Sequence, residues 1–196
     1  MFTGIIEKMG VVKKISATGG NKTFWIKSPF SSRLKVDQSV SHDGVCLTVE
    51  EIKGDRHRVT AISETITKTA IGNWQPGYLV NLERCMKLND RLDGHFVQGH
   101  VDTAGTCINK VEKGGSWEFN FEYPVEFAEL IIEKGSITIN GISLTAFNVS
   151  VNTFTVAIIP YTFENTNIKL VEPGHKVNLE FDLLGKYISR KLSLNK

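Results

Sequence analysis

The chain repeats part of its own sequence after 97 residues. Ser39 to Glu83 aligns without a gap on Ser136 to Glu180, and 15 of these 45 positions are identical. Upstream the alignment continues with an offset of 95, which pairs Gly4 with Gly99. An ungapped match of this length indicates a tandem duplication, and two copies are too few for a solenoid. The sequence therefore predicts two homologous domains, residues 1–92 and 93–183, and a tail, residues 184–196, without a counterpart.

Composition limits the classes of protein that need to be considered. The chain has 196 residues, which suits two small domains that each bury a core. Its 23 basic residues are dispersed among 21 acidic ones, so nucleic acid is not an expected partner. No apolar run approaches the length of a membrane span, so no membrane contact is expected. Three cysteines without CxxC spacing indicate reduced thiols, and we expect a soluble, cytoplasmic protein.

Short alternating stretches separated by polar turns predict an all-β fold. We expect strands at 4–14, 23–27, 59–63 and 79–85, and two more on either side of a tight turn at Asp43-Gly44. Each copy is expected to hold one short helix, at 28–34 and near 127–134. A connection between the copies is expected at 87–94. This pattern is typical of small antiparallel barrels.

The tail carries apolar residues at helical spacing. Leu184, Tyr187, Ile188 and Leu192 fall on one face of a helix. A helix this short is marginal in water by itself. We therefore expect it to pack on its own barrels or on neighbouring subunits.

Several motifs resemble those of the riboflavin synthase family. They are MFTGII at 1–6, GVCLTV at 44–49, VNLER at 80–84, GHFVQGHVD at 94–102 and GISLT at 141–145. The likeness follows the whole chain in order; Ala146, in place of a more usual valine, and the residues 41–43 depart from it. It implies a tandem pair of six-stranded Greek-key antiparallel barrels with a short C-terminal helix that holds a homotrimer.

The resemblance also implies a reaction. Riboflavin synthases bind two molecules of 6,7-dimethyl-8-ribityllumazine per site, and a four-carbon unit passes from one to the other. The products are riboflavin and 5-amino-6-ribitylaminouracil, and no cofactor is expected because the pteridine ring is its own electron sink. Two identical substrates need two similar pockets, which a duplication supplies. Lumazine synthase is a further partner that the resemblance suggests.

Site residues follow from the same motifs. The resemblance assigns catalysis to Cys46, His100, Ser143 and Thr145, and substrate binding to Gly4, Ser39, Gly44, Thr48, Thr65, Lys134, Gly141, Thr162 and Asp182. Plainer interpretations stay open for some of these residues. Gly44 and Gly141 suit tight turns, Thr65 and Thr162 are ordinary β-formers, and Lys134 and Asp182 could be solvated charges.

Cys46 and Ser143 occupy the same position of the repeat. A thiol ionises much closer to neutral pH than a hydroxyl, so Cys46 is expected to be partly anionic and to act at the chemical step. The alternative is a small buried apolar residue.

His95 and His100 are five residues apart, so on a strand they would face opposite ways and could not share a metal. No metal site is expected. The resemblance makes His100 a pocket histidine that moves protons, and His95 is expected to be structural.

Two other classes of function remain open. A lumazine-binding fluorescent protein would share the fold without turnover, but such proteins tend to lose pocket residues that are present here: Cys46, His100, Ser143 and Thr145. The flavin-binding barrel of a reductase would need a separate nicotinamide domain, for which this chain has no room.

Overall fold

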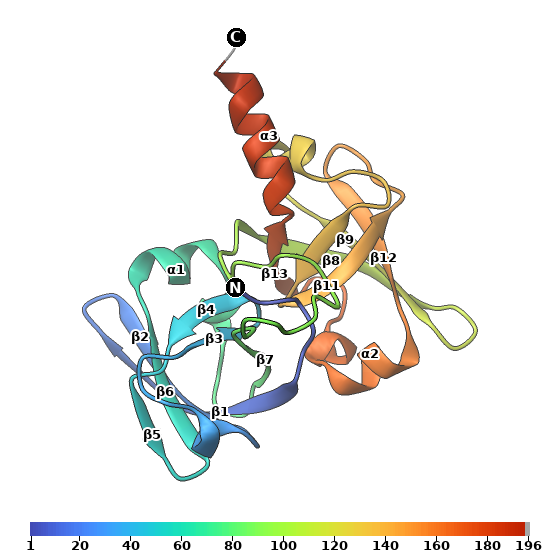
Figure 1. Cartoon of the computed structure of the whole chain (residues 1–196). Helices are drawn as coiled ribbons and strands as arrows, with labels where there is room; N and C mark the ends of the chain where they lie inside the picture. Colours follow the sequence, from blue (N-terminus) through green and yellow to red (C-terminus); the bar gives the residue numbers. More distant parts are fainter. Residues whose placement is uncertain (195–196) are drawn as a thin grey trace.

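The computed structural model describes residues 1–194 and consists of two β-barrels followed by a C-terminal helix (Figure 1). The strands of the first barrel are β1 (Lys8–Thr18), β2 (Asn21–Lys27), β3 (Ser39–His42), β4 (Val45–Thr48), β5 (Glu51–Lys53), β6 (Arg56–Ala61) and β7 (Leu79–Arg84). Those of the second are β8 (Thr103–Glu112), β9 (Trp117–Glu122), β10 (Ser136–Ile139), β11 (Ile142–Phe147), β12 (Thr153–Ile158) and β13 (Lys176–Phe181). The expected pair of antiparallel barrels is confirmed.

The two barrels share one strand order but close differently. The second is a closed barrel in the order β10-β11-β12-β9-β8-β13. In the first barrel, Val49 and Glu50 interrupt the strand that corresponds to β11, which leaves β4 and β5 at the two ends of the sheet. The Glu50 N–H still donates to the Arg58 carbonyl at 2.9 Å. The first barrel therefore closes through residues 49–50, which connect the end strands β4 and β5.

The short helices differ from those that the sequence predicted. Only single 3-10 helices occur in the expected regions, at Ser31–Arg33 and Val125–Leu130. The α-helices of the two copies are α1 (Ser63–Lys68) and α2 (Pro160–Asn165). Each ends where a threonine hydroxyl donates to a carbonyl one turn earlier, Thr69 to Thr65 and Thr166 to Thr162. Six residues are too few for a periodic apolar pattern, so these helices could not be predicted from the sequence.

The first expected strand starts later than predicted. β1 begins at Lys8 rather than Gly4 and continues to Thr18. Gly4 has φ +79°, which is a left-handed conformation that a strand does not use. Residues 3–5 instead form a loop that reaches the second copy.

Each barrel encloses its own apolar core. Phe24 packs edge-on against Trp74 in the first barrel, and Phe121 packs against Phe154 in the second, all of them buried. Fully burying a side chain of this kind contributes roughly 1.5–3 kcal/mol. No helix within residues 1–194 is both long and apolar enough to span a bilayer.

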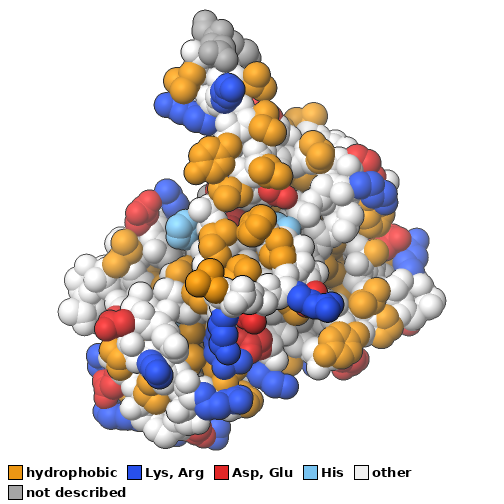
Figure 2. Space-filling view, viewed as in Figure 1, with side chains coloured by type: hydrophobic (Ala, Val, Ile, Leu, Met, Phe, Trp, Pro, Cys, Tyr) orange, Lys and Arg blue, Asp and Glu red, His pale blue; other side chains and the backbone are white. Residues whose placement is uncertain are grey.

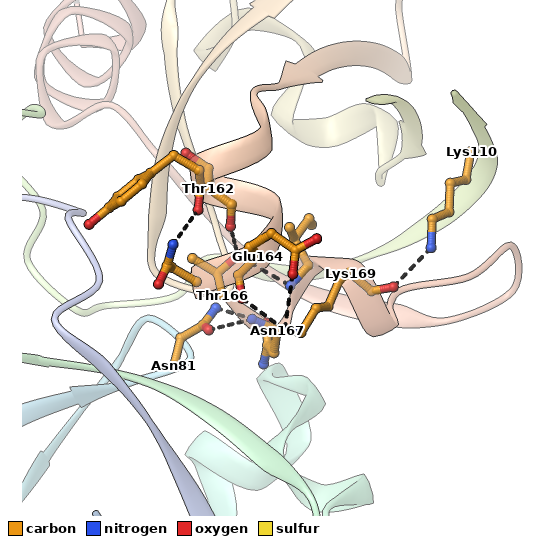
Figure 3. A network of polar contacts seen from close by, with 10 residues as sticks. Asn81, Lys110, Thr162, Glu164, Thr166, Asn167 and Lys169 are labelled. Carbon is orange, nitrogen blue, oxygen red and sulfur yellow. Dashed lines mark hydrogen bonds and ion pairs between the residues drawn. The ribbon is translucent and has the colours of Figure 1, made fainter. Parts of the chain in front are cut away.

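A polar network joins the barrels around an approximate twofold axis. The Asn81 side chain donates to the Asn140 carbonyl at 3.0 Å, and its repeat partner Asn178 donates to the Asp43 carbonyl at 2.8 Å. Asn167, the first residue of the 3-10 helix Asn167–Leu170, exchanges two hydrogen bonds with Asn81 (Figure 3). These groups are buried and bonded, so the two barrels meet in one fixed arrangement.

The helix α3 (Leu183–Ser193) projects from the barrels (Figure 1). The side chains of Leu184, Tyr187, Ile188 and Leu192 are each at least 60% exposed. Hydrophobic side chains continue along the helix and onto the junction of the barrels (Figure 2). Of the two alternatives for the tail, packing on its own barrels is therefore wrong for these four residues; positions 195–196 of the predicted helical segment lie outside the described residues.

Candidate active site

The second copy holds an open cavity of about 660 Å³. Ser143 and Thr145, two apart on β11, face the same side of the strand and line it. Thr162 lines it from α2, and Lys134 from the turn before β10. The Lys134 ammonium lies 5.1 Å from the centre of the Phe147 ring, which also lines the cavity. The structure thus brings together four residues that were predicted as site residues.

The first copy presents the repeat counterparts on its own surface. Ser39 on β3 lies directly opposite Thr48 on β4, and Cys46 is two residues before Thr48 on the same face. Thr65 lies on α1, as Thr162 lies on α2. Ser39, Cys46 and Thr65 are half-buried and Thr48 is exposed. Hydroxyl and thiol groups in the same register therefore line both copies.

The Cys46 thiol is not activated in this chain. Burial raises its pKa, and the hydrogen bond with the Ser39 hydroxyl only partly opposes this effect. A raised pKa leaves the thiol protonated at neutral pH. The raised pKa disfavours the partly anionic Cys46 that the sequence predicted, because burial in the fold stabilises the neutral thiol.

The strands that carry Ser143 and Cys46 each contact a loop from the other copy. We call residues 3–5 the N-terminal arm and residues 98–100 the junction arm. The Ser143 N–H donates to the Gly4 carbonyl at 2.8 Å, and the Cys46 N–H donates to the Gly99 carbonyl at 2.8 Å. Both glycines have φ +79°, and a β-carbon on either would lie 2.6 Å from the β-carbon of its partner. Only glycine permits this approach.

The two histidines of the junction have different surroundings. His95 Nδ1 lies 2.7 Å from the Ser143 hydroxyl and its Nε2 lies 3.2 Å from the Thr138 hydroxyl. Burial lowers the pKa of His95, while nearby Asp182 raises it. His100 is exposed and lines a separate cavity of about 820 Å³ with Lys68. His95 was missed because it has no counterpart in copy one, so the repeat gave no signal.

Three of the predicted binding residues have other contacts. Gly44 and Gly141 meet at the interface between the barrels, where a β-carbon on Gly44 would lie 2.9 Å from the Gly141 nitrogen. The space beside their α-carbons is filled by backbone, which agrees with the plainer interpretation of both residues as turn glycines. Asp182 accepts a hydrogen bond from the Leu184 N–H at 2.9 Å and caps α3.

Comparison with known proteins identifies the family. The model of the lumazine binding domain matches twice, at residues 3–85 and 98–182. The riboflavin synthase of Bacillus subtilis is 35% identical over 98% of this chain and 90% of that protein. The chain belongs to the riboflavin synthase family. The riboflavin synthase of Mycobacterium tuberculosis, 37% identical over 97% of both chains, agrees with this assignment.

A solved structure has the same architecture. LumP, crystallised with riboflavin, superposes with a TM-score of 0.87 at 25% identity over 92% of this chain and 99% of its own. As a riboflavin synthase, the chain is an enzyme of the transferase type whose two domains bind lumazines. No group of three or more His, Cys, Asp or Glu side chains within residues 1–194 is arranged to hold a metal ion.

Proposed function

We propose that this riboflavin synthase acts on two molecules of 6,7-dimethyl-8-ribityllumazine, one in each copy, and transfers a four-carbon unit between them. The observation that carries the proposal is the pair of matched surfaces, with Ser143 and Thr145 in one copy and Cys46 and Thr48 in the other. Two pockets of one design suit two identical reactants. Holding two reactants in a reactive orientation can lower the barrier by about 7–11 kcal/mol.

The reaction proceeds without a cofactor in this proposal. Loss of a proton from the C7 methyl group of the lumazine gives an anion that the pteridine ring delocalises, so the substrate supplies the electron sink. The protein needs only to bind both rings and to move protons. Groups that can do so are present in both copies as hydroxyls, a thiol and imidazoles.

We assign catalytic roles to Cys46, His100, Ser143 and Thr145, and we add His95. The contact of His95 with Ser143 supports this addition, because a neutral imidazole beside a hydroxyl can accept a proton from it. The lowered pKa keeps His95 neutral at pH 7.

Binding of the ribityl chain and the pyrimidine edge falls to the remaining polar groups. These are the side chains of Ser39, Thr48, Thr65, Lys134, Thr162 and Asp182, while Gly4 contributes by holding the strand of Ser143 through its carbonyl. The cavity of copy two, which includes Lys134 and Thr162, supports this assignment. Asp182 retains one carboxylate oxygen that does not cap α3.

The working assembly in this proposal is a homotrimer held by α3. The exposed apolar side chains of α3 support it, since four such residues on an isolated helix are otherwise unfavourable. In a trimer the first barrel of one subunit faces the second barrel of its neighbour and brings two lumazines together. The domains in this proposal are residues 1–92, 93–183 and 184–196. The enzyme works in the cytoplasm. Lumazine synthase is a suitable partner because it would supply the substrate.

The second candidate is a lumazine-binding protein without turnover, which the likeness to LumP supports. Incubation with 6,7-dimethyl-8-ribityllumazine distinguishes the two. Riboflavin absorbance that increases with time supports the enzyme. Tight binding of the lumazine with no riboflavin formed would establish the second candidate.

A further inference from the structure

Two buried glutamates occupy the same position of the repeat. Glu83 lies on β7 and Glu180 on β13, and their exposed fractions are 4% and 2%. Burial raises the pKa of both carboxyl groups, while hydrogen bonds from the backbone lower it. A buried carboxylate is unfavourable unless it is hydrogen-bonded. The groups that donate hydrogen bonds to each carboxylate therefore indicate its structural role.

Each carboxylate binds the arm of its own copy. Glu83 accepts hydrogen bonds from the Thr3 N–H at 2.6 Å, the Thr3 hydroxyl at 2.8 Å and the Gly4 N–H at 3.0 Å. Glu180 accepts from three successive N–H groups, those of Gln98 at 2.7 Å, Gly99 at 2.9 Å and His100 at 2.9 Å. Three donors on each carboxylate fix each arm, which otherwise lacks the pairing of a strand.

Each arm then reaches the other copy. Gly4 is held by Glu83 of the first barrel but accepts the N–H of Ser143 in the second. Gly99 is held by Glu180 of the second barrel but accepts the N–H of Cys46 in the first. The N-terminal segment and the residues before the junction arm also pair, through Phe2 and Val97.

We propose that Glu83 and Glu180 are positioning residues that act crosswise, each carboxylate in one barrel setting the geometry of the ligand pocket in the other. The inference rests on the proposed function in taking the cavity of copy two and the matching surface around Cys46 in copy one as the lumazine pockets. A pocket is then complete only when the opposite barrel is folded and its glutamate holds its arm. This arrangement makes each pocket depend on both barrels of its own chain.

Amide hydrogen exchange tests the crossing in the full chain without any ligand. Glu83→Gln keeps the size of the side chain but turns an NH₂ group toward donors, so at least one of the three hydrogen bonds is lost. We expect exchange at the Ser143 amide to accelerate about ten- to a hundredfold, with the Cys46 amide unchanged. Glu180→Gln should do the reverse.

A riboflavin titration, followed at the same two amides by NMR, gives the second measurement. Glu83→Gln should raise the Kd at the pocket of Ser143 about tenfold or more and leave the pocket of Cys46 unaffected. Glu7→Gln is the matched control. Glu7 lies two residues after the N-terminal arm, but its carboxylate pairs with Arg84 rather than with an arm. This control should alter neither pocket. Thr3→Val, which removes one donor to Glu83, should act in the same crossed direction, and it replaces Glu83→Gln if that variant does not fold.

The opposite pattern would overturn the inference. Suppose that Glu83→Gln and Thr3→Val accelerated amide exchange or raised the Kd of riboflavin at the pocket of Cys46 and changed neither quantity at the pocket of Ser143. Each glutamate would then support only its own barrel. Unchanged exchange at both amides would also overturn it. If riboflavin bound neither pocket of the unmodified protein, the proposed function would fail, while the exchange data would still decide the crossing.

Discussion

At the scale of single residues, a buried pair of histidines distinguishes the first barrel from the second. His42 Nε2 lies 2.9 Å from His57 Nε2, and His57 Nδ1 lies 2.8 Å from the Ser31 hydroxyl. His42 Nδ1 must donate to the Val40 carbonyl, which fixes the direction of the chain of hydrogen bonds. The second barrel has Ile139 and Phe154 at the corresponding positions, also buried.

This pair predicts a loss of stability in mild acid. Burial lowers the pKa of His57 to about 4 and holds the pKa of His42 well below its ordinary value. The unfolded chain, with ordinary histidines near 6.5, therefore binds more protons below that pH. The contribution to the free energy of unfolding is complete above pH ~6.5 and is lost as the pH falls toward 4, by about 3 kcal/mol for His57 alone.

Urea unfolding at pH 7 and pH 5 measures the effect, with a double variant as control. His42→Ile with His57→Phe installs the residues of the second barrel and leaves the Ser28–Ser31 bond in place. The variant should lose less stability than the unmodified protein between the two pH values, since its carboxylates are the same. Equal losses in both proteins would show that the histidines do not titrate as their burial requires.

The Cys46→Ser variant tests the chemical asymmetry of the two copies. The thiol is protonated at neutral pH, so its expected role is to give or to return a proton near C7 of the lumazine. We expect kcat to fall by on the order of a hundredfold while the affinity for the lumazine stays nearly constant. Single-turnover kinetics beside a fluorescence titration separate the two quantities. A near-normal single-turnover rate in Cys46→Ser would show that Cys46 only fills space beside the ring.

Some of these residues could be predicted from the sequence, and others could not. The family resemblance assigned Ser143, Thr145 and Thr162, and the repeat supports them because each has a counterpart 97 residues earlier. The repeat could not expose His95, which has no partner, nor the pKa of Cys46, which depends on burial. Gly44 illustrates a further limit: the sequence predicted its left-handed turn, but only the fold shows that another backbone occupies the adjacent space.

At the scale of elements, α3 makes the most direct prediction. Deleting residues 184–196 removes the exposed apolar face formed by Leu184, Tyr187, Ile188 and Leu192. The truncated protein should be a monomer that binds lumazine but turns it over at least about a hundredfold more slowly, because two lumazines no longer face each other. Sedimentation and a turnover assay check the two parts. A truncated protein that is trimeric and fully active would contradict the role of α3.

Some elements leave a recognisable pattern in the sequence, and others leave none. Period-two alternation located most strands, since burial on one face leaves a direct trace in the sequence. The six-residue α1 and α2 left no such trace, and the two arms are not regular elements at all. Their positions depend on Glu83 and Glu180, whose partners come from distant parts of the chain.

At the scale of the whole molecule, the first copy should fold by itself. Residues 1–92 contain all the strands of the first barrel, and its closure uses no strand of the second. Expressed alone, this fragment should fold and bind lumazine more weakly, because it lacks the junction arm that contacts Cys46. It should also self-pair, since the turn at Gly44 loses its natural partner at Gly141. Circular dichroism, sedimentation and a lumazine titration test these points, and an unfolded fragment would refute the independence of the copies.

The duplicated barrels provide matched pockets of one design, and in the trimer the two identical molecules held in facing pockets react with each other. The most direct measurement follows all three compounds while the purified protein consumes 6,7-dimethyl-8-ribityllumazine. We expect two lumazines to disappear for each riboflavin formed, with an equal amount of 5-amino-6-ribitylaminouracil and no added cofactor. Lumazine that binds tightly and is recovered unchanged would contradict it.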